Sequence, residues 1–527
     1  MKASVTDHQP VSRAVSKVAS KAVAENGSSD LDHEQCYRAL AARDARFDGQ
    51  FYTAVHSTGI YCRPICPART PSSQGVTFYA SAAGASQAGF RPCLRCRPEL
   101  APAERYWHSD DAVTDRLSRL VAEGQLEQLG LPALAAQMGY SERHLRRLYT
   151  ARWGVNLVEA AQVRRLHLAK QLLQDSSLSV TEVAAAAGFN SLRRFNDLIK
   201  SRWGVSPSLF RKQTGNSKTP KNAAASTIEL RLQTRAPFDW PHLLGFLRDR
   251  HLPTVERVGE NDYCRVIRFT AADGEVVMGQ IAVRQHSETE LRAELSDSLL
   301  PYLAHIMPRL RRLFDLDSNP EAIGHALAAN ADIYPLWQRW PGTRVPGVWS
   351  AFEVSVRAVL GQQISVKAAR TLVTRFVARF GQPLPSELQQ EGLTHSFPEP
   401  EQLADANFDG LGITGRRIET IKALAAGFAS GELDFVTGDP QQQRERLLAI
   451  KGIGPWTVSY MAMRGLGDPN AFPAGDLILR RGLTIGQEYS EKEMEALSQP
   501  WRPWRAYCAL LLWRHYVAEV LGKHLTE

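Results

Sequence analysis

The sequence predicts a multidomain fold: a small cysteine-stapled α+β module, an all-α domain of two helix-turn-helix units, and a C-terminal α+β region. Three observations lead to this prediction: a cluster of four cysteines, a repeated helical unit, and β-branched alternation that gives way to helical periodicity in the second half. The last region should comprise a β-rich subdomain followed by a helical one. A length of 527 residues agrees, because it suggests about three or four domains.

Shifts in composition set the expected boundaries. The segment 213–226 has no apolar anchor and is rich in Gly, Pro, Ser, Lys and Asn, which is typical of a linker. Residues 1–30 carry scattered basic residues but no apolar core of a secretory signal, so we expect a disordered tail. The expected division is a tail at 1–30, the cysteine module at 31–98, the helix-turn-helix domain at 106–212, the linker at 213–226, the β-rich subdomain at 227–345 and the helical domain at 346–527.

The overall composition argues against a membrane protein and favours a polyanion partner. With 44% hydrophobic and 22% charged residues, no apolar run approaches the roughly 18 residues of a membrane span, so we expect no membrane role. Residues 141–212 hold thirteen Lys and Arg against five Asp and Glu, an excess of eight that equals the +8 of the whole chain. Such a basic face indicates a polyanion, with a merely solvated surface as the alternative.

The seven cysteines fit a reduced cytosol better than a disulfide framework, so we expect a cytoplasmic location.

The cysteine module contains two closely spaced pairs. Cys62 and Cys66 are separated by three residues, Cys93 and Cys96 by two, and twenty-six residues lie between the pairs. This is the spacing of a tetrathiolate zinc site, so we expect one Zn²⁺ to staple the module. Most sites of this kind are closed and structural, which is the alternative to a reactive site.

The residues around the cysteines favour a reactive site. The segments 58–69 and 89–96 resemble the N-terminal domain of Ada adaptive-response regulators, and the likeness covers about residues 32–98. In that family the first cysteine irreversibly accepts a methyl group from a methylphosphotriester of the DNA backbone, which implies Cys62 here. The resemblance also implies contacts with the DNA backbone for Thr58, Arg69 and Arg91.

Zinc and thiol chemistry agree with this reading. Zinc keeps thiols deprotonated at neutral pH, and a thiolate is the nucleophile that S-methylation requires. Four thiolates on one Zn²⁺ carry a formal charge of −2, which one methylation halves. The module would then repel phosphate less after methyl transfer, so damage would raise its affinity for DNA.

Residues 106–212 contain an internal repeat. The sequence Arg-Trp-Gly-Val at 152–155 recurs at 202–205. Each copy has apolar residues at helical spacing, then a glycine, then a second helix that opens at Ser141 or at Ser191. The arrangement resembles the AraC-type regulator domain, which Ada proteins carry after their zinc module; a generic helical hairpin is the alternative. The candidate DNA-reading side chains on the second helices are Arg143, His144, Arg146 and Arg147 in the first unit and Arg193, Arg194 and Asn196 in the second.

The helical C-terminal region contains a hairpin followed by an aspartate. Residues 447–457 indicate a helix, a Gly-Ile-Gly turn and a second helix opened by Pro455. Gly452, Ile453 and Gly454 would let backbone amides approach a DNA phosphate. Asp476, about twenty residues later, would on its own be an N-cap. Together the hairpin and Asp476 match the helix-hairpin-helix glycosylase pattern, which implies a catalytic role for this aspartate.

The resemblance is closest to AlkA-type 3-methyladenine DNA glycosylases and covers about residues 227–520. It includes the segments 236–247, 312–320, 357–363 and 501–505. The family implies an aromatic pocket for a flipped base at Phe246, Trp456, Tyr460 and Trp513, and a side chain filling the vacated space at Gln363. It also implies a monovalent cation held by the backbone carbonyls of Leu448, Ile450 and Gly452. An electron-rich pocket suits a cationic alkylated purine, since stacking and cation–π contacts both favour it.

Two positions depart from better-known relatives of the glycosylase. Gly475 and Leu477 flank the aspartate where those relatives have acidic or aromatic residues, which changes the pocket wall.

The position after the hairpin is Trp456 rather than the lysine that strand-cutting relatives use, so we expect base excision without lyase activity. The chain also lacks a Pro-Cys-His-Arg sequence, so repair of O6-methylguanine by a second methyl transfer is not expected.

Together the resemblances imply a monomeric, nucleoid-associated DNA-alkylation repair protein: a zinc-thiolate methyl acceptor and transcription activator joined to a monofunctional 3-methyladenine DNA glycosylase. The implied partners are double-stranded DNA with alkylated bases, methylphosphotriesters or promoter sites, and RNA polymerase. One alternative is a regulator whose glycosylase half only binds damaged DNA. Another keeps all four cysteines purely structural.

Overall fold

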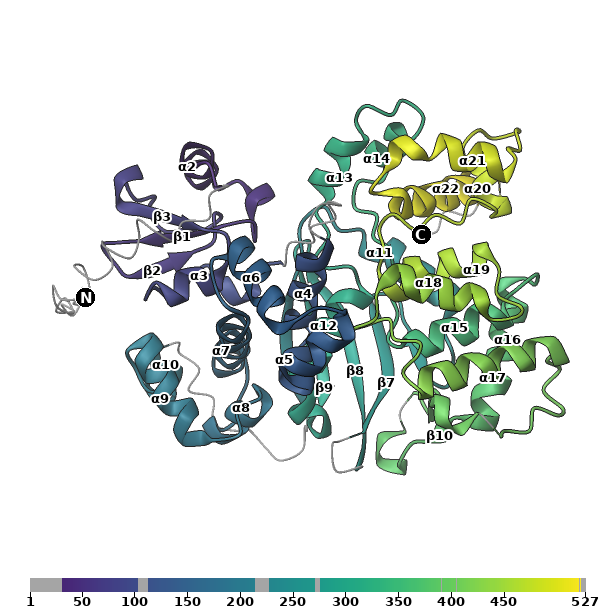
Figure 1. Cartoon of the computed structure of the whole chain (residues 1–527), viewed down its shortest axis with the longest axis horizontal. Coiled ribbons are helices and arrows are strands. Elements are labelled where there is room, and N and C mark those ends of the chain that lie inside the picture. Colours follow the sequence, from purple (N-terminus) through teal and green to yellow (C-terminus); the bar gives the residue numbers. More distant parts are fainter. Residues whose placement is uncertain are drawn as a thin grey trace.

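The computed structural model describes residues 31–102, 112–213, 227–270, 275–389, 391–403, 405–520 and 522. The expected tail at 1–30 lies outside these residues. The expected linker begins one residue too early, because Gln213 still ends a helix, and the rest of it lies outside the described residues. Figure 1 shows the N-terminal module, the helical domain and the C-terminal half packed against one another.

The N-terminal module is built on a four-stranded sheet of order β3-β1-β2-β4. Its elements are α2 (His33–Ala42), η1 (Ala45–Phe47), β1 (Tyr52–Val55), β2 (Ile60–Cys62), η2 (Ser73–Gly75), β3 (Val76–Tyr79), α3 (Ala82–Gln87), β4 (Arg91–Pro92) and η3 (Pro98–Leu100). β4 is parallel to β2, with Tyr61 opposite Pro92. Because Cys62 and Cys93 follow these paired residues, the register brings the two cysteine pairs together.

In the described residues of the next domain there are seven helices, and they confirm the two helix-turn-helix units. They are α4 (Ala112–Ala122), α5 (Gln125–Met138), α6 (Glu142–Trp153), α7 (Leu157–Asp175), α8 (Val180–Ala186), α9 (Leu192–Trp203) and α10 (Pro207–Gln213). Ser141 and Ser191 cap the second helix of each unit, as expected, by accepting from the backbone N–H three residues on. Gly154 and Gly204 end these helices at φ +69° and +76°, a conformation that glycine adopts without steric cost.

The β-rich subdomain is a five-stranded antiparallel sheet of order β5-β9-β8-β7-β6, so β5 is an edge strand. Its elements are β5 (Thr227–Gln233), α11 (Trp240–Arg250), β6 (Glu256–Val258), β7 (Asp262–Thr270), β8 (Val276–Ser287), β9 (Glu290–Ser296), η5 (Asp297–Tyr302), α12 (Leu303–Leu313), α13 (Pro320–Leu327) and α14 (Tyr334–Arg339). The alternating segments of the sequence are therefore strands, as expected.

The last part of the chain, as far as the structure describes it, is helical apart from one short strand pair. Its elements are α15 (Ala351–Leu360), α16 (Val366–Phe380), β10 (Gln382–Pro383), η6 (Ser386–Leu388), β11 (His395–Ser396), η7 (Pro400–Gln402), α17 (Gly415–Ala429), α18 (Pro440–Ala449), α19 (Pro455–Met461), the π-helical η8 (Ala462–Leu466), α20 (Leu477–Gly482), α21 (Glu491–Leu497), η9 (Gln499–Trp501) and α22 (Arg505–Val520). One apolar cluster, which also includes Phe246 of α11, forms its core. Among the described residues, no helix has both the length and the apolar character needed to span a membrane.

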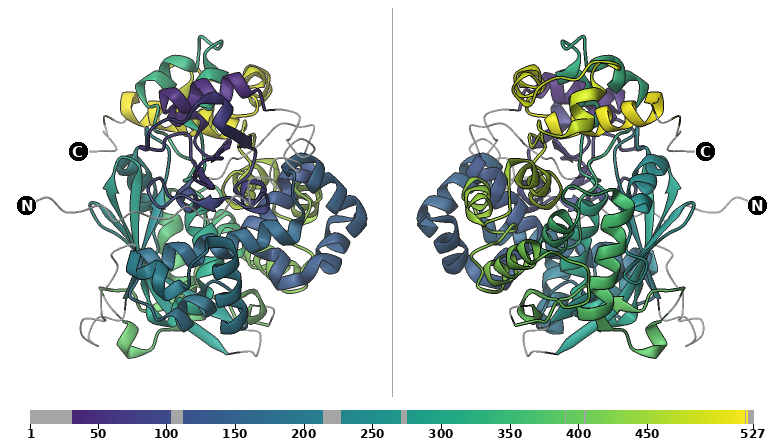
Figure 2. Two further views of the ribbon diagram at one scale, coloured as in Figure 1. Left: turned by 90° about the vertical axis from the view of Figure 1, so that its left-hand side faces the viewer. Right: turned by 90° about the vertical axis from the view of Figure 1, so that its right-hand side faces the viewer.

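The domains share hydrophobic surface, which the sequence does not predict. A single apolar cluster runs from Leu166 and Phe195 of the helix-turn-helix domain to Leu230 and Leu232 of β5. On the other side, Arg116 and Arg119 of α4 donate to the carbonyls of Thr437 and Leu466 in the C-terminal helical domain. Figure 2 shows the molecule from its two ends, with the N-terminal module toward the viewer on the left and the C-terminal helices toward the viewer on the right. The N-terminal and C-terminal halves therefore form one packed body.

Candidate functional sites

The four clustered cysteines meet at one point of the N-terminal module. Cys62 ends β2, Cys66 lies in the turn after it, and Cys93 and Cys96 follow β4. Their sulfur atoms all lie within 4.8 Å of one another, and all four residues are buried. The donor set fits Zn²⁺, which takes four thiolates in tetrahedral geometry. Exposure does not single out the acceptor, since Cys62 is 8% exposed and the other three are 6–7% exposed.

Four thiols this close cannot all be ionised without a cation. Hydrogen bonding with Cys62 lowers the pKa of Cys66 to about 7, whereas hydrogen bonding with Cys66 raises the pKa of Cys62. A bound divalent cation removes this conflict, because it stabilises every thiolate together. Backbone N–H groups of Arg63 and Arg95 add donors to the sulfurs of Cys96 and Cys93, at 3.3 and 3.4 Å.

The three side chains expected to contact the DNA backbone around this centre differ in setting. Thr58, in the turn between β1 and β2, and Arg69 are exposed. Arg91 is also exposed, but its Nη1 donates to the carbonyl of Trp203 at the end of α9, 3.2 Å away. Arg91 therefore joins the module to the second helix-turn-helix unit, a contact that the sequence did not reveal.

The second helices of the two helix-turn-helix units present the expected basic faces. Leu145 and Tyr149 of α6 are buried, as are Phe195 and Ile199 of α9. The opposite faces expose Arg143, Arg146, Arg147, Arg193 and Arg194, whereas His144 and Asn196 are half-buried. A groove of about 600 Å³ runs beside α9 and is lined by Arg165, Asn190, Ser191 and Arg194 among others. Both units thus offer cationic side chains, and the second adds the amide of Asn196, as a duplex reader requires.

The expected hairpin joins α18 to α19. Gly452 has φ +97°, and a Cβ there would lie 2.4 Å from the Thr420 hydroxyl, so both conformation and space require glycine. Thr420 donates to the Lys451 carbonyl at 2.8 Å. The Ile453 side chain is buried, so this residue presents only its backbone. Gly454 has open space at its Cα, which leaves room for a close approach.

The loop before α16 adjoins the hairpin. Gln362 Nε2 donates to the Gly452 carbonyl at 2.9 Å and to the Thr457 hydroxyl at 3.1 Å. Its neighbour Gln363 is exposed and has φ +57°, the left-handed conformation that costs a non-glycine residue energy. The fold thus holds the exposed Gln363 side chain, on a strained backbone, beside the hairpin.

Asp476 caps α20 and is held by two tryptophans. Its Oδ1 accepts from the backbone N–H groups of Ile478 and Leu479 at 3.0 and 3.1 Å, and from Trp513 Nε1 at 3.0 Å. Its Oδ2 accepts from Trp456 Nε1 at 3.0 Å. The sequence indicated the cap and the aromatic residues, but not that the two indoles bind the carboxylate.

The remaining aromatic residues lie nearby, together with two arginines that the sequence analysis missed. Tyr460 stacks on Trp456, with ring centroids 5.4 Å apart and planes 5° apart. The guanidinium groups of Arg250 and Arg464 lie 3.8 and 5.1 Å from the centroid of the Phe246 ring. These charges oppose a full positive charge on a base at that end of the site. Their sole sequence signal is position, since each is four residues after an aromatic residue expected in the base pocket.

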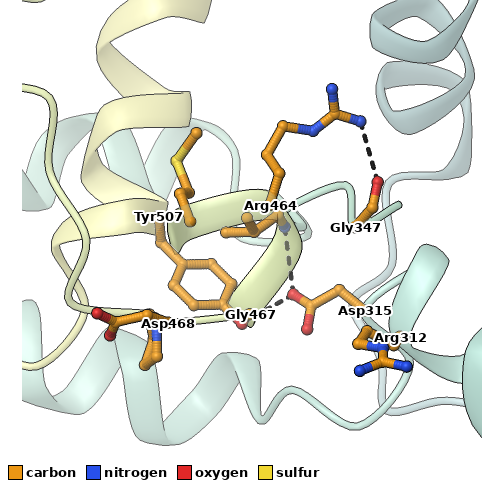
Figure 3. A pocket seen from close by; sticks show the side chains of 10 residues that line it. Arg312, Asp315, Gly347, Arg464, Gly467, Asp468 and Tyr507 are labelled. Atoms are coloured by element: carbon orange, nitrogen blue, oxygen red, sulfur yellow. Dashed lines mark hydrogen bonds between the residues drawn. The ribbon is translucent and has the colours of Figure 1, made fainter. Parts of the chain in front are cut away.

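Arg464 also interacts with Tyr460. Its Nη1 donates to the Tyr460 hydroxyl at 2.9 Å. Burial raises the pKa of Tyr460, but the charges of Arg464 and Arg250 outweigh burial and hold that pKa below its ordinary value. Figure 3 shows Arg464 reaching the Gly347 carbonyl beside a void of about 20 Å³, near Asp315 and Tyr507. That void has room for no more than one water, so it is too small to hold a purine.

Comparisons with known proteins match every part of this architecture. Four family models cover the chain in series: Metal binding domain of Ada at 35–99, Helix-turn-helix domain at 134–213, AlkA N-terminal domain at 229–350, and HhH-GPD superfamily base excision DNA repair protein at 356–505. The chain thus joins an Ada-type metal-binding module and a helix-turn-helix domain to a base-excision repair glycosylase fold.

Individual relatives extend over one half or the whole. A protein of Mycobacterium tuberculosis described as "Probable bifunctional transcriptional activator/DNA repair enzyme AlkA" is 40% identical over 92% of this chain and 96% of its own length. DNA-3-methyladenine glycosylase 2 of Escherichia coli is 33% identical over 54% of this chain and 95% of its own. A solved 3-methyladenine DNA glycosylase from Archaeoglobus fulgidus is 25% identical, with a TM-score of 0.47, over 54% of this chain and 97% of that one. The chain belongs to the AlkA family of bifunctional transcriptional activator/DNA repair enzymes.

Proposed function

We propose that the chain excises alkylated purines from DNA by hydrolysing the N-glycosidic bond, and that its N-terminal half senses methylation damage and activates transcription. The observation that carries the first part is Asp476, whose carboxylate is fixed by two indole and two backbone N–H donors beside the hairpin. A preorganised carboxylate of this kind stabilises developing positive charge on a sugar. Relatives named as 3-methyladenine glycosylases support the substrate class.

In the proposed reaction each of these residues has one role. A flipped purine enters beside Trp456 and Tyr460, and Gln363 fills the gap in the duplex. As the bond to the base breaks, the electron pair leaves with the base and the sugar becomes oxocarbenium-like. Asp476 stabilises that charge or orients the attacking water, whose oxygen forms the new bond to the sugar and whose proton passes to the surrounding water. The amides of Gly452 and Gly454 bind a phosphate and hold the strand.

The same arrangement favours a monofunctional enzyme. A lyase reaction needs an amine that forms a Schiff base with the abasic sugar. The residue after the hairpin and its proline is Trp456, whose indole nitrogen donates to Asp476 and is not a nucleophilic amine. Abasic DNA should therefore be the end product. A covalent DNA complex trapped by borohydride would contradict this assignment.

For the N-terminal module, we propose transfer of a methyl group to Cys62. The thiolate sulfur attacks the methyl carbon of a methylphosphotriester, the S–C bond forms, the C–O bond breaks, and the phosphodiester leaves as an anion. Bound zinc would keep the thiolate ionised. Thr58, Arg69 and Arg91 would hold the backbone. The match to the metal-binding domain of Ada and the four converging sulfurs support this proposal.

Methylation removes one negative charge beside a basic DNA-reading domain, so we propose that it tightens promoter binding through α6 and α9. The activated complex would then recruit RNA polymerase, with the protein acting as a monomer. The alternative, a regulator whose glycosylase half only binds damage, predicts no base release at all.

We further propose a monovalent cation at the carbonyls of Leu448, Ile450 and Gly452. Ile450 and Gly452 each already accept one hydrogen bond, from Ile453 N and Gln362 Nε2, which leaves each carbonyl one lone pair for an ion. Replacing potassium and sodium by a bulky organic cation should then weaken DNA binding. Unchanged affinity would exclude the ion.

One experiment tests both halves. The full chain is incubated with methylated duplex; released bases are separated by chromatography, and the protein is weighed intact. We expect 3-methyladenine in solution and one methyl group on the protein. Without base release the enzyme assignment fails, and without added mass the four cysteines are structural only.

A further inference from the structure

Arg63, the residue after Cys62, lies against the four-cysteine site. Its side chain is 4% exposed, and its backbone N–H donates to the Cys96 sulfur at 3.3 Å. Its Nη1 donates to the Cys96 carbonyl at 3.1 Å, while Nε and Nη2 bind the Asp48 carboxylate. A change of charge or shape at Cys96 therefore acts directly on Arg63.

The guanidinium of Arg63 also contacts the glycosylase half. Arg63 Nη1 donates to Gln233 Oε1 at 2.7 Å, and Gln233 is the last residue of β5. A second contact runs in the opposite direction, since Arg235 Nη2 donates to the Asp48 carbonyl at 2.7 Å. Two hydrogen bonds thus join the module to a three-residue stretch of the glycosylase half.

That stretch leads to the helix of the base pocket. Arg344, fully buried, donates to the carbonyls of Arg235 and Pro237 at 2.7 and 2.9 Å. Two residues later Asp239 caps α11, the helix that carries Phe246. The geometry of the stretch therefore sets where α11 begins.

Asp239, the residue that caps α11, is also connected to Asp476, the proposed catalytic aspartate. Asp239 Oδ2 binds Arg514 Nη1 of α22 at 2.7 Å. The preceding residue, Trp513, donates to Asp476 Oδ1 at 3.0 Å. Every step from Cys96 to Asp476 is a hydrogen bond, an ion pair or a short run of chain.

The helix-turn-helix domain also contacts β5, the strand that ends at Gln233. Lys170 of α7 donates to the Cys93 carbonyl at 3.2 Å, and the adjacent Gln171 donates to the Arg231 carbonyl of β5 at 2.8 Å. Lys170 is fully buried and also binds Glu99 of the module. The zinc module, α7 and β5 thus meet in one buried polar junction.

We propose that the zinc module is a positioning element of the glycosylase, in which Arg63 and Gln233 transmit the state of the four-cysteine site to the base pocket and Asp476. Buried hydrogen bonds are strong and directional, so a displaced donor at one end moves its acceptor at the other. Loss of the metal, or of the charge of one thiolate, changes the charge next to Arg63. This change weakens the hydrogen bond from Arg63 to Gln233. The proposal rests on the proposed function only in naming Asp476 as the catalytic end.

The test uses Gln233→Met in the full chain. Methionine keeps the length of the side chain but removes the amide oxygen that accepts from Arg63. We expect unchanged zinc content, amide hydrogen exchange of residues 235–246 at least fivefold faster, and a fall of about fivefold or more in kcat/KM for excision, typical of such coupling. Gln285→Met, another sheet glutamine, on β8, is the matched control and should resemble the wild type.

Removing zinc with a chelator completes the test. In the wild type it should accelerate exchange at 235–246, whereas in Gln233→Met it should add little, because the connection is already cut. The proposal is overturned if the variant exchanges and excises like the wild type, or if chelation has equal effects in both. If neither protein excises bases, the proposed glycosylase function fails, while the exchange comparison still decides whether the module positions α11.

Discussion

Replacing Asp476 by Asn separates the charge of this residue from its shape. The Asn oxygen can still accept from Ile478 N, Leu479 N and Trp513, but its NH₂ group must then face the Trp456 N–H across 3.0 Å. Two donors cannot bond, and an unsatisfied buried donor costs about 1–3 kcal/mol. We therefore expect a loss of unfolding free energy of about that size, together with a fall in excision on the order of 100-fold or more from the lost charge.

A second substitution distinguishes these two effects. In Asp476→Asn/Trp456→Phe the opposing donor is gone, so most of the lost stability should return while excision stays low. Chemical unfolding measures the first quantity, and single-turnover release of 3-methyladenine at saturating enzyme measures the second. If excision recovered along with stability, Asp476 would be a structural cap rather than a catalytic group. Near wild-type excision by the single Asn variant would refute the assignment outright.

Three further predictions use other sites. In Cys62→Ala the protein should gain no methyl group from methylphosphotriester DNA by intact mass, whereas Cys36→Ala, which alters a cysteine outside the cluster, should still gain one. Gln363→Gly should raise unfolding free energy by about 0.5 kcal/mol by relieving left-handed strain, yet slow excision about tenfold; unchanged excision would remove its role. Burial lowers the pKa of His167 from 6.5 to about 4. Between these pH values the unfolded chain binds a proton at His167 and the folded chain does not. Stability should fall by up to about 3 kcal/mol as pH drops from 6.5 to 4, and His167→Gln should flatten that decline in chemical unfolding.

Local signals in the sequence predicted the elements well. The spacing of Cys62 and Cys93 indicated a shared centre because metal ligands must converge, and the register of β2 with β4 brings these cysteines together. The serines that cap α6 and α9 were identifiable because capping depends on neighbours three residues away. The aspartate before α20 was recognisable for the same reason.

Contacts between distant residues were not predictable. The indole of Trp513 binds Asp476 across 37 positions, and Arg63 binds Gln233 across 170. No periodicity or spacing encodes such pairs, since they depend on how whole domains pack. The half-buried Arg250 and the buried Arg464 beside Phe246 were missed because charged residues are usually assigned to the surface.

The edge position of β5 has a consequence for the history of this gene. The Arg231 carbonyl of that strand accepts from Gln171, and Leu230 and Leu232 share an apolar cluster with the helix-turn-helix domain. A glycosylase cut free at 213–226 would expose this strand and its apolar neighbours, and bare edges recruit other strands. Once the halves had become fused and adapted to each other, fission would carry a penalty in aggregation. Selection on either half therefore constrains the other, and the two would be inherited as one unit.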